Sequence, residues 1–169
     1  MSGNEIAVKC SGITKAFGGV VANDDINLEV KYGEILALLG ENGSGKTTLM
    51  NMLSGIYHPD KGTIAISGKT VAINSPKDSI ALGIGMIHQH FKLVEVFTAA
   101  DNIVAGTKGS LKGKGAVRDE INKISEQLGL EVDPDKKVYN MSVSEKQTVE
   151  ILKVLYRGAK ILILDEPMN

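Results

Sequence analysis

The sequence predicts an α/β fold with a central, mostly parallel sheet, and two stretches of the chain carry this prediction. In the first, a short apolar run at residues 35–39 leads into a glycine-rich loop, and a segment of helical character at 47–53 follows. In the second, the apolar run 161–164 leads directly into two carboxylates, Asp165 and Glu166. Apolar runs without polar alternation are typical of strands buried on both faces, as in a parallel sheet covered by helices.

The glycine-rich loop matches the phosphate-loop pattern G-x-x-x-x-G-K-[ST]. Its glycines lack Cβ atoms, so backbone N–H groups are able to approach an oxyanion closely, and the helix that follows adds its positive N-terminal end. Lys46 supplies a charge to the β and γ phosphates, and the Thr47 hydroxyl is placed to ligate Mg²⁺. We therefore expect a nucleoside triphosphate with Mg²⁺ to be bound by Gly40, Asn42, Gly43, Ser44, Gly45, Lys46, Thr47 and Thr48.

The second stretch predicts chemistry at the end of a buried strand. Ligands of open α/β sheets bind at the carboxyl ends of the strands, which is where Asp165 and Glu166 are expected. Asp165 is placed to hold Mg²⁺ through its water shell, and Glu166 to orient or deprotonate an attacking water.

Between these stretches, Ser142 and Glu145 have the spacing of a capping box, and the apolar residues behind them continue as a helix. The order of motifs is a phosphate loop, then the segment 86–90, then this serine-led helix start, then I-L-I-L-D-E-P. This order resembles the nucleotide-binding domain of ABC transporters, and the resemblance covers the whole chain.

The resemblance implies a role for several further residues. Gln89 matches the glutamine of the Q-loop, and it joins Glu166 as a catalytic residue and Thr47 and Asp165 as a metal ligand. Phe17 matches the aromatic residue that stacks on adenine. The segment 141–145 sits where the family has its L-S-G-G-Q signature, so Ser142 and Ser144 are expected to contact ATP bound on a partner domain.

One branch of the family is the most similar: the ATPase subunits of bacterial nucleoside and simple-sugar importers, whose long chains usually carry two such domains in tandem. Segments 20–25, 74–78, 82–91 and 149–155 carry this similarity. It implies ATP and Mg²⁺ as cofactors, permease subunits and a second nucleotide-binding domain as partners, and an indirect link to a substrate-binding protein. It also implies a peripheral location on the cytoplasmic face of the plasma membrane.

Two departures from the family pattern limit this inference. The first departure lies in the signature and the residues just after it. The signature of this branch typically reads L-S-V-G-E, and Ser144 stands where that pattern has glycine, so it adds a side chain at the point of contact with the γ-phosphate. Thr148 stands where an arginine is common.

The second departure is that the D-loop and the switch histidine of the family would follow residue 169, while His58, His88 and His90 all precede Asp165. The family strand that lies between the phosphate-loop strand and the 161–164 strand is also expected after that point. We therefore expect an α/β fold incomplete at the C-terminus, negligible ATP turnover by these residues alone, and a tendency to aggregate.

The predicted organisation is a single partial domain over 1–169. It comprises an ATP-binding core with an antiparallel β part at 1–90, a helical subdomain at 91–156, and the strand with its carboxylates at 157–169. The local elements expected are antiparallel strands around 6–13 and 26–30, a hairpin of 63–66 with 70–73, a short helix from Ser75, a strand at 84–87, and capped or glycine-ended helices at 98–106 and 116–129. Residues 108–115 are predicted to be a solvated basic loop rather than a phosphate-binding one.

The composition is compatible with a cytoplasmic ATPase and gives little further information about function. A formal net charge of −1 and a pI near 6.3 give no reason to expect nucleic-acid binding. No apolar stretch approaches the ~20 residues that span a bilayer, no signal peptide is discernible, and the single cysteine, Cys10, suits a reducing compartment.

Two classes of function stay open: a transport ATPase subunit, and a truncated nucleotide-binding fragment with little or no ATPase activity. A soluble ABC ATPase of repair or translation is less favoured because of the importer-like segments. A GTPase is disfavoured because the sequence has no N-K-x-D motif.

Overall fold

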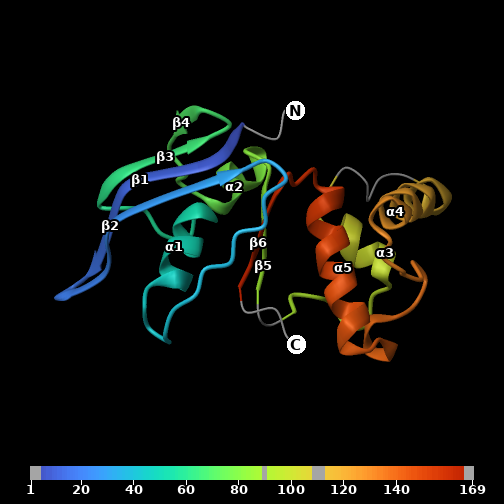
Figure 1. Cartoon of the computed structure of the whole chain (residues 1–169). Helices are drawn as coiled ribbons and strands as arrows, with labels where there is room; N and C mark the ends of the chain where they lie inside the picture. Colours follow the sequence, from blue (N-terminus) through green and yellow to red (C-terminus); the bar gives the residue numbers. More distant parts are fainter. Residues whose placement is uncertain (1–4, 89–90, 108–112, 166–169) are drawn as a thin grey trace. The chain divides into compact units, whose positions relative to one another are not determined.

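The computed structural model describes residues 5–88, 91–107 and 113–165 (Figure 1). The chain divides into two compact units, Met1–Ile84 and Gly85–Asn169. Gln89, Glu166 and most of the predicted basic loop lie outside the described residues. No described helix is long and apolar enough to cross a membrane.

The first unit is built on a four-stranded sheet in the order β2-β1-β3-β4. β1 (Ile6–Phe17) pairs antiparallel with β2 (Val20–Lys31) and with β3 (Lys61–Ile66), and β3 pairs antiparallel with β4 (Lys69–Val71). The antiparallel N-terminal part and its hairpin are thus confirmed.

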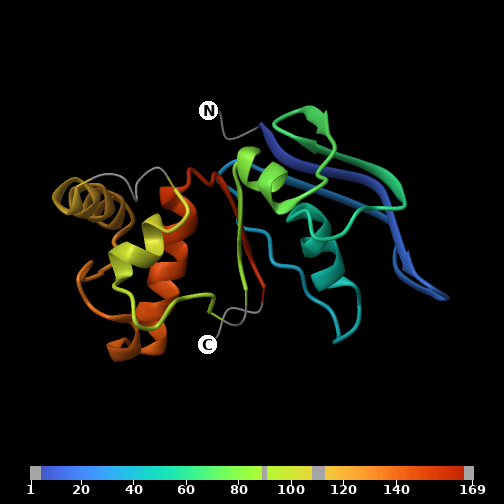
Figure 2. The ribbon, with the colours of Figure 1, turned by 180° about the vertical axis from the view of Figure 1, so that it is seen from behind.

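Helix α1 (Lys46–Leu53) lies on one side of this sheet, as Figure 1 and the reverse view in Figure 2 show. Apolar side chains of β1 and β3 and of α1 are buried; they include Val8, Cys10, Ile13, Leu49, Met52, Leu53, Ile64 and Ile66. Burying one such large apolar side chain contributes about 1.5–3 kcal/mol, so this layer holds α1 against the sheet. Helix α2 (Pro76–Ala81) is capped by Ser75, whose hydroxyl accepts from the backbone N–H of Asp78, as predicted.

Strands β5 (Ile84–Ile87) and β6 (Ile161–Leu164) form a two-stranded sheet and run in the same direction in Figures 1 and 2. The existence of both strands was predicted correctly. The expectation that β6 is buried on both faces is wrong in this structure. Ile163 is buried, whereas Leu162 and Leu164 are 41% and 48% exposed, because the described residues leave one face of β6 largely uncovered.

Helices α3 (Ala99–Val104), α4 (Lys114–Leu128) and α5 (Val143–Tyr156), with a short 3₁₀ turn at Val138–Asn140, pack around one apolar cluster. The capping box predicted for Ser142 and Glu145 is present on α5, and the capped helix predicted from residue 98 begins with a second box, Thr98 with Asp101. Helix α4 ends at Gly129 in the left-handed conformation, also as predicted. Its start was predicted two residues too late, because Lys114 and Gly115 belong to the helix and not to the preceding loop.

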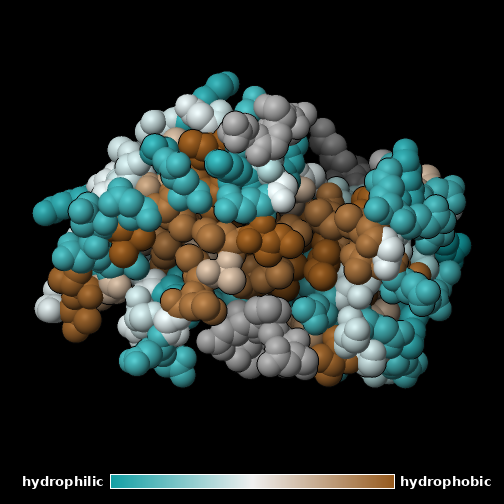
Figure 3. All heavy atoms as spheres, viewed as in Figure 1, coloured by the Kyte–Doolittle hydropathy of each residue, from teal (hydrophilic) through white to brown (hydrophobic). Residues whose placement is uncertain are grey.

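The predicted strand at residues 35–39 is not formed. This stretch is irregular, and Ile35 and Leu39 are 99% and 92% exposed. A strand needs a neighbour to take up its backbone N–H and C=O groups, and no described segment pairs with this one. Figure 3, seen from the side that shows this coil in Figure 1, has a broad area of apolar surface.

These exposed side chains predict self-association of residues 1–169 in isolation. Replacing Ile35 by Thr and Leu39 by Asn should raise the fraction that elutes as a monomer in size-exclusion chromatography, because the exposed apolar area decreases without loss of buried contacts. Ile13→Thr is the opposite control, since it places a hydroxyl in the core and should lower the melting temperature. A wild-type chain that is monodisperse and melts in one cooperative transition would contradict the prediction.

Candidate nucleotide-binding site

Strand β2 contacts the phosphate loop at Gly45. Gly45 is the N-cap of α1 with φ 88°, and a Cβ at this position would lie 2.2 Å from the backbone oxygen of Ala22. The buried side chain of Asn23 donates from Nδ2 to the Gly45 carbonyl at 3.2 Å. Glycine is therefore required at 45 both by backbone conformation and by space.

The N-terminus of α1 has no side-chain cap among the described residues. The first N–H groups of an uncapped helix lack a partner within the helix and point along the axis, and together with the helix dipole they favour an anion. Thr47 and Thr48 lie in this first turn, with Thr47 exposed and Thr48 half-buried.

Lys46 folds back over the loop that precedes it. Its Nζ donates to the carbonyl oxygens of Gly40 and Glu41 at 2.7 and 2.8 Å, and to Oγ of Ser44 at 3.3 Å. The ammonium thus keeps the loop curled around itself. A phosphate group placed in the loop would meet this charge at short range.

Phe17, the predicted adenine contact, is the last residue of β1 and is 43% exposed. Tyr57 packs against it edge-to-face with ring centroids 5.0 Å apart, and Lys15 Nζ lies over the Phe17 ring at 5.4 Å from its centroid. Asp60 holds this end of β1: it pairs with Lys15 at 2.8 Å and accepts the backbone N–H of Ala16 at 2.8 Å. These bonds lower the pKa of the Asp60 carboxyl, the Lys15 hydrogen bond most.

Sequence reasoning did not single out Tyr57 and Asp60 as part of the site. Tyr57 gave a usable signal, since the chain has only four Tyr and three Phe and no Trp, so an aromatic just past the phosphate-loop helix stands out. Asp60 gave none, because its partner Lys15 lies 45 residues away in the sequence.

Asp165 follows β6, and its backbone N–H donates to the Ile87 carbonyl at 3.1 Å, so the ends of β5 and β6 lie side by side. His88 follows Ile87, and its pKa is lowered, first by desolvation and then by the charge of Lys92. Thr47 belongs to the first unit and Asp165 to the second, and Gln89 and Glu166 lie outside the described residues. The predicted metal and catalytic sets therefore stay predictions.

Ser142 and Ser144 occupy the start of α5 with different surroundings. Ser142 Oγ accepts from the Glu145 N–H at 3.3 Å, and the Ser142 N–H donates to Glu145 Oε2 at 2.8 Å. Lys136 Nζ lies 2.6 Å from Glu145 Oε1, and these contacts, the Lys136 bond first, lower the pKa of Glu145 to about 2. The Ser142 hydroxyl is thus used in capping, whereas Ser144 is exposed in the first turn.

Together, the glycine-rich loop that leads into α1 and the apolar strand that ends before Asp165 are features of phosphate-loop nucleotide-binding proteins. A profile of the ABC transporter family matches residues 23–169, and the chain belongs to this family. The predicted resemblance is therefore confirmed.

Curated relatives show which members of the family are similar. The nucleoside import ATP-binding protein NupA of Lactococcus lactis is 52% identical over 167 residues, covering 97% of this chain and 33% of its own length. The guanosine import ATP-binding protein NupO of Bacillus subtilis is 53% identical over 167 residues, covering 96% and 32%. The ribose import ATP-binding protein RbsA 1 of Rubrobacter xylanophilus is 45% identical over 159 residues, covering 92% and 32%. The chain thus spans about a third of the length of these relatives.

Solved structures confirm the fold. CbiO1 of Clostridium perfringens, part of an ABC transporter complex, superposes with a TM-score of 0.83 at 29% identity, covering 97% of this chain and 66% of that one. An ATP-binding cassette in its ADP conformation gives a TM-score of 0.84 at 27% identity, covering 96% and 69%.

The close approach of Gly45 to β2 predicts a large effect of a single methyl group. Gly45→Ala should lower stability by more than the about 1–2 kcal/mol that a left-handed alanine costs, because the Ala22 oxygen must also move. Gly33→Ala is the matched control, since Gly33 also has positive φ, 77°, but no neighbour near its Cβ position. Thermal melts of the two variants that lie within error of each other would contradict this account.

The contacts of Glu145 predict a pH dependence of helix α5. Because its folded pKa, about 2, lies below the ordinary value of 4.5, the stabilisation is present above pH 4.5 and is lost as pH falls toward 2. The difference in melting temperature between wild type and Glu145→Gln should therefore be largest near pH 7 and shrink toward pH 2. A difference that grows on acidification would show that the carboxylate contacts do not stabilise the helix start.

Proposed function

We propose that this chain binds ATP with Mg²⁺ and is the ATP-binding part of an importer of nucleosides or simple sugars. The observation that carries the proposal is the phosphate loop, in which Gly45 is held against β2 and Lys46 lies over the loop carbonyls. The names of the similar relatives, which are ATP-binding proteins of nucleoside and sugar import, support the substrate class.

In this proposal the first unit binds the nucleotide. The loop N–H groups and the α1 N-terminus accept the phosphates, and Lys46 exchanges its carbonyl partners for the β and γ phosphate oxygens. Phe17 stacks on the adenine, with Tyr57 against its ring. Thr47 and Gln89 are the proposed side-chain ligands of Mg²⁺, and Asp165 holds it through its water shell, because Mg²⁺ usually keeps several waters and takes only one or two protein ligands beside the phosphates.

Hydrolysis requires that a water, the metal and the γ-phosphate are held together. Glu166 orients or deprotonates that water, Gln89 assists, and the signature of a second nucleotide-binding domain closes over the phosphate. On this chain the signature hydroxyls are those of Ser142 and Ser144. Because Ser142 is engaged in its capping box, Ser144 is the hydroxyl better placed to donate to ATP on a partner domain.

The proposed partners are integral-membrane permease subunits and a second nucleotide-binding domain, with a substrate-binding protein acting through the permease. The proposed place is the cytoplasmic face of the plasma membrane, where the chain is held peripherally. Under this proposal, closure around ATP is transmitted to the permease through the segment that follows Gln89.

The proposal predicts that Lys46→Ala loses most of its ATP affinity, about 10-fold or more, because the phosphates lose the loop's full positive charge. Titration with a fluorescent ATP analogue in the presence of Mg²⁺ measures the affinity. Lys69→Ala, which removes an exposed lysine of β4, is the charge-matched control and should bind as wild type does. Equal affinities of wild type and Lys46→Ala would remove the nucleotide-binding role.

A further inference from the structure

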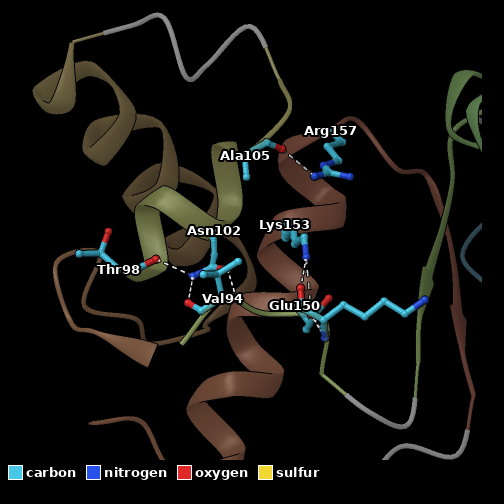
Figure 4. A network of polar contacts seen from close by, with 8 residues as sticks. Val94, Thr98, Asn102, Ala105, Glu150, Lys153 and Arg157 are labelled. Atoms are coloured by element: carbon cyan, nitrogen blue, oxygen red, sulfur yellow. Dashed lines mark hydrogen bonds and ion pairs between the residues drawn. The ribbon is translucent and has the colours of Figure 1, made fainter. Parts of the chain in front are cut away.

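Backbone groups of the segment 92–94 are bound by side chains of helices rather than by a strand. The N–H of Lys92 donates to Glu150 Oε1 at 2.8 Å, and the Lys92 carbonyl accepts from Lys153 Nζ at 2.8 Å. Glu150 and Lys153 are one turn apart on α5 and form an ion pair at 3.6 Å. Figure 4 shows both side chains meeting at this side of the helix.

Asn102 of α3 binds the backbone N–H and C=O groups of Val94, two residues after Lys92. Its Oδ1 accepts the N–H of Val94 at 2.7 Å, and its Nδ2 donates to the carbonyls of Val94 at 3.1 Å and Thr98 at 3.0 Å (Figure 4). The orientation of the amide follows from this pattern, since only oxygen can accept the N–H. Asn102 is 2% exposed, so these bonds are shielded from water.

The helices that supply these side chains are themselves joined. Arg157, which follows α5, donates from Nη2 to the carbonyl of Ala105, which follows α3, at 2.8 Å (Figure 4). Val149 and Leu152 of α5 lie in the same apolar cluster as Ile103 of α3. The segment 92–94 is therefore hydrogen-bonded to α3 and α5, two helices that also pack against each other.

The Glu150 side chain is a buried carboxylate. Glu150 is only 6% exposed and stands beside the core residue Val149. A buried carboxylate is unfavourable unless it is paired and hydrogen-bonded, and an apolar residue would fill the same volume at lower cost. What the carboxylate adds here is a bond to the backbone of Lys92.

We propose that Glu150, Lys153 and Asn102 are positioning residues that make the segment after Gln89 move as one body with α5. Lys92 lies three residues after Gln89, and the other end of α5 carries Ser142 and Ser144. Eight residues separate Ser142 from Glu150 along the helix, a distance of about 12 Å. A displacement of the segment 92–94 on nucleotide binding is thereby carried to the signature serines.

This inference rests on the proposed function, and it separates two properties. ATP affinity is set by the phosphate loop, whereas the response at the start of α5 depends on Glu150, Lys153 and Asn102. Removing one of these side chains should leave affinity unchanged and reduce the response. A residue with only a structural role would not separate the two.

The test uses the full chain with a fluorophore at Val143→Cys, an exposed position at the start of α5. The native Cys10 does not compete for the label, because it is buried and burial raises the pKa of its thiol to about 11. ATP with Mg²⁺ is titrated, and the midpoint and the amplitude of the emission change are recorded. A fluorescent ATP analogue reports binding separately.

In Glu150→Ala we expect an unchanged midpoint, within about twofold, and an amplitude reduced about threefold or more. Glu150→Gln keeps an oxygen that accepts the Lys92 N–H and should restore most of the amplitude. Glu126→Ala, an exposed glutamate of α4, should match wild type. If Glu150→Ala does not fold, Lys153→Met, which removes the bond to the Lys92 carbonyl and the ion pair with Glu150, takes its place with the same expectation.

Equal amplitudes in wild type and Glu150→Ala, or in wild type and Lys153→Met, would overturn the inference. So would a label that stays silent while the analogue reports bound ATP in the wild-type chain. Absence of analogue binding in the wild type would instead contradict the proposed function, so the two failures are distinguishable.

Discussion

The close approach of Gly45 to strand β2 is the constraint on which the nucleotide site depends. Because no Cβ fits between Gly45 and the Ala22 oxygen, the loop is pressed against the sheet and α1 starts at a fixed point. Asn23 adds a hydrogen bond at the same place, and Lys46 closes the loop on itself. The antiparallel strands thus serve the phosphate site although they contribute none of its predicted phosphate-binding residues.

Local signals predicted most of the elements correctly, because they are encoded by neighbouring residues. The capping boxes of α3 and α5 each lie within four residues, and the apolar stripe of α4 repeats at helical spacing up to Gly129. Residues 35–39 failed for the opposite reason. Their composition favours a strand, but a strand forms only where another segment supplies the ladder, and no described segment does so.

The residues of the candidate site also fall into those that the sequence predicts and those that it does not. The phosphate loop was readable because its spacing in the sequence is its geometry, and the structure shows each of its residues. The supporting residues were not readable: Asp60 acts on Lys15, and Glu150 acts on Lys92, across 45 and 58 positions of sequence. Contacts between residues so far apart in the sequence depend on how whole helices and strands pack, and local sequence spacing does not predict that packing.

The segments 92–94 and 35–39 are both irregular stretches outside the sheets, but side chains of helices bind the backbone of 92–94. This difference affects how each segment can associate with another chain. An exposed backbone edge is a template on which another chain can add a strand. At Lys92 and Val94 that template is already occupied, because Glu150, Lys153 and Asn102 take up the backbone groups that an incoming strand would need. Side chains of α3 and α5 therefore protect this stretch from promiscuous strand addition.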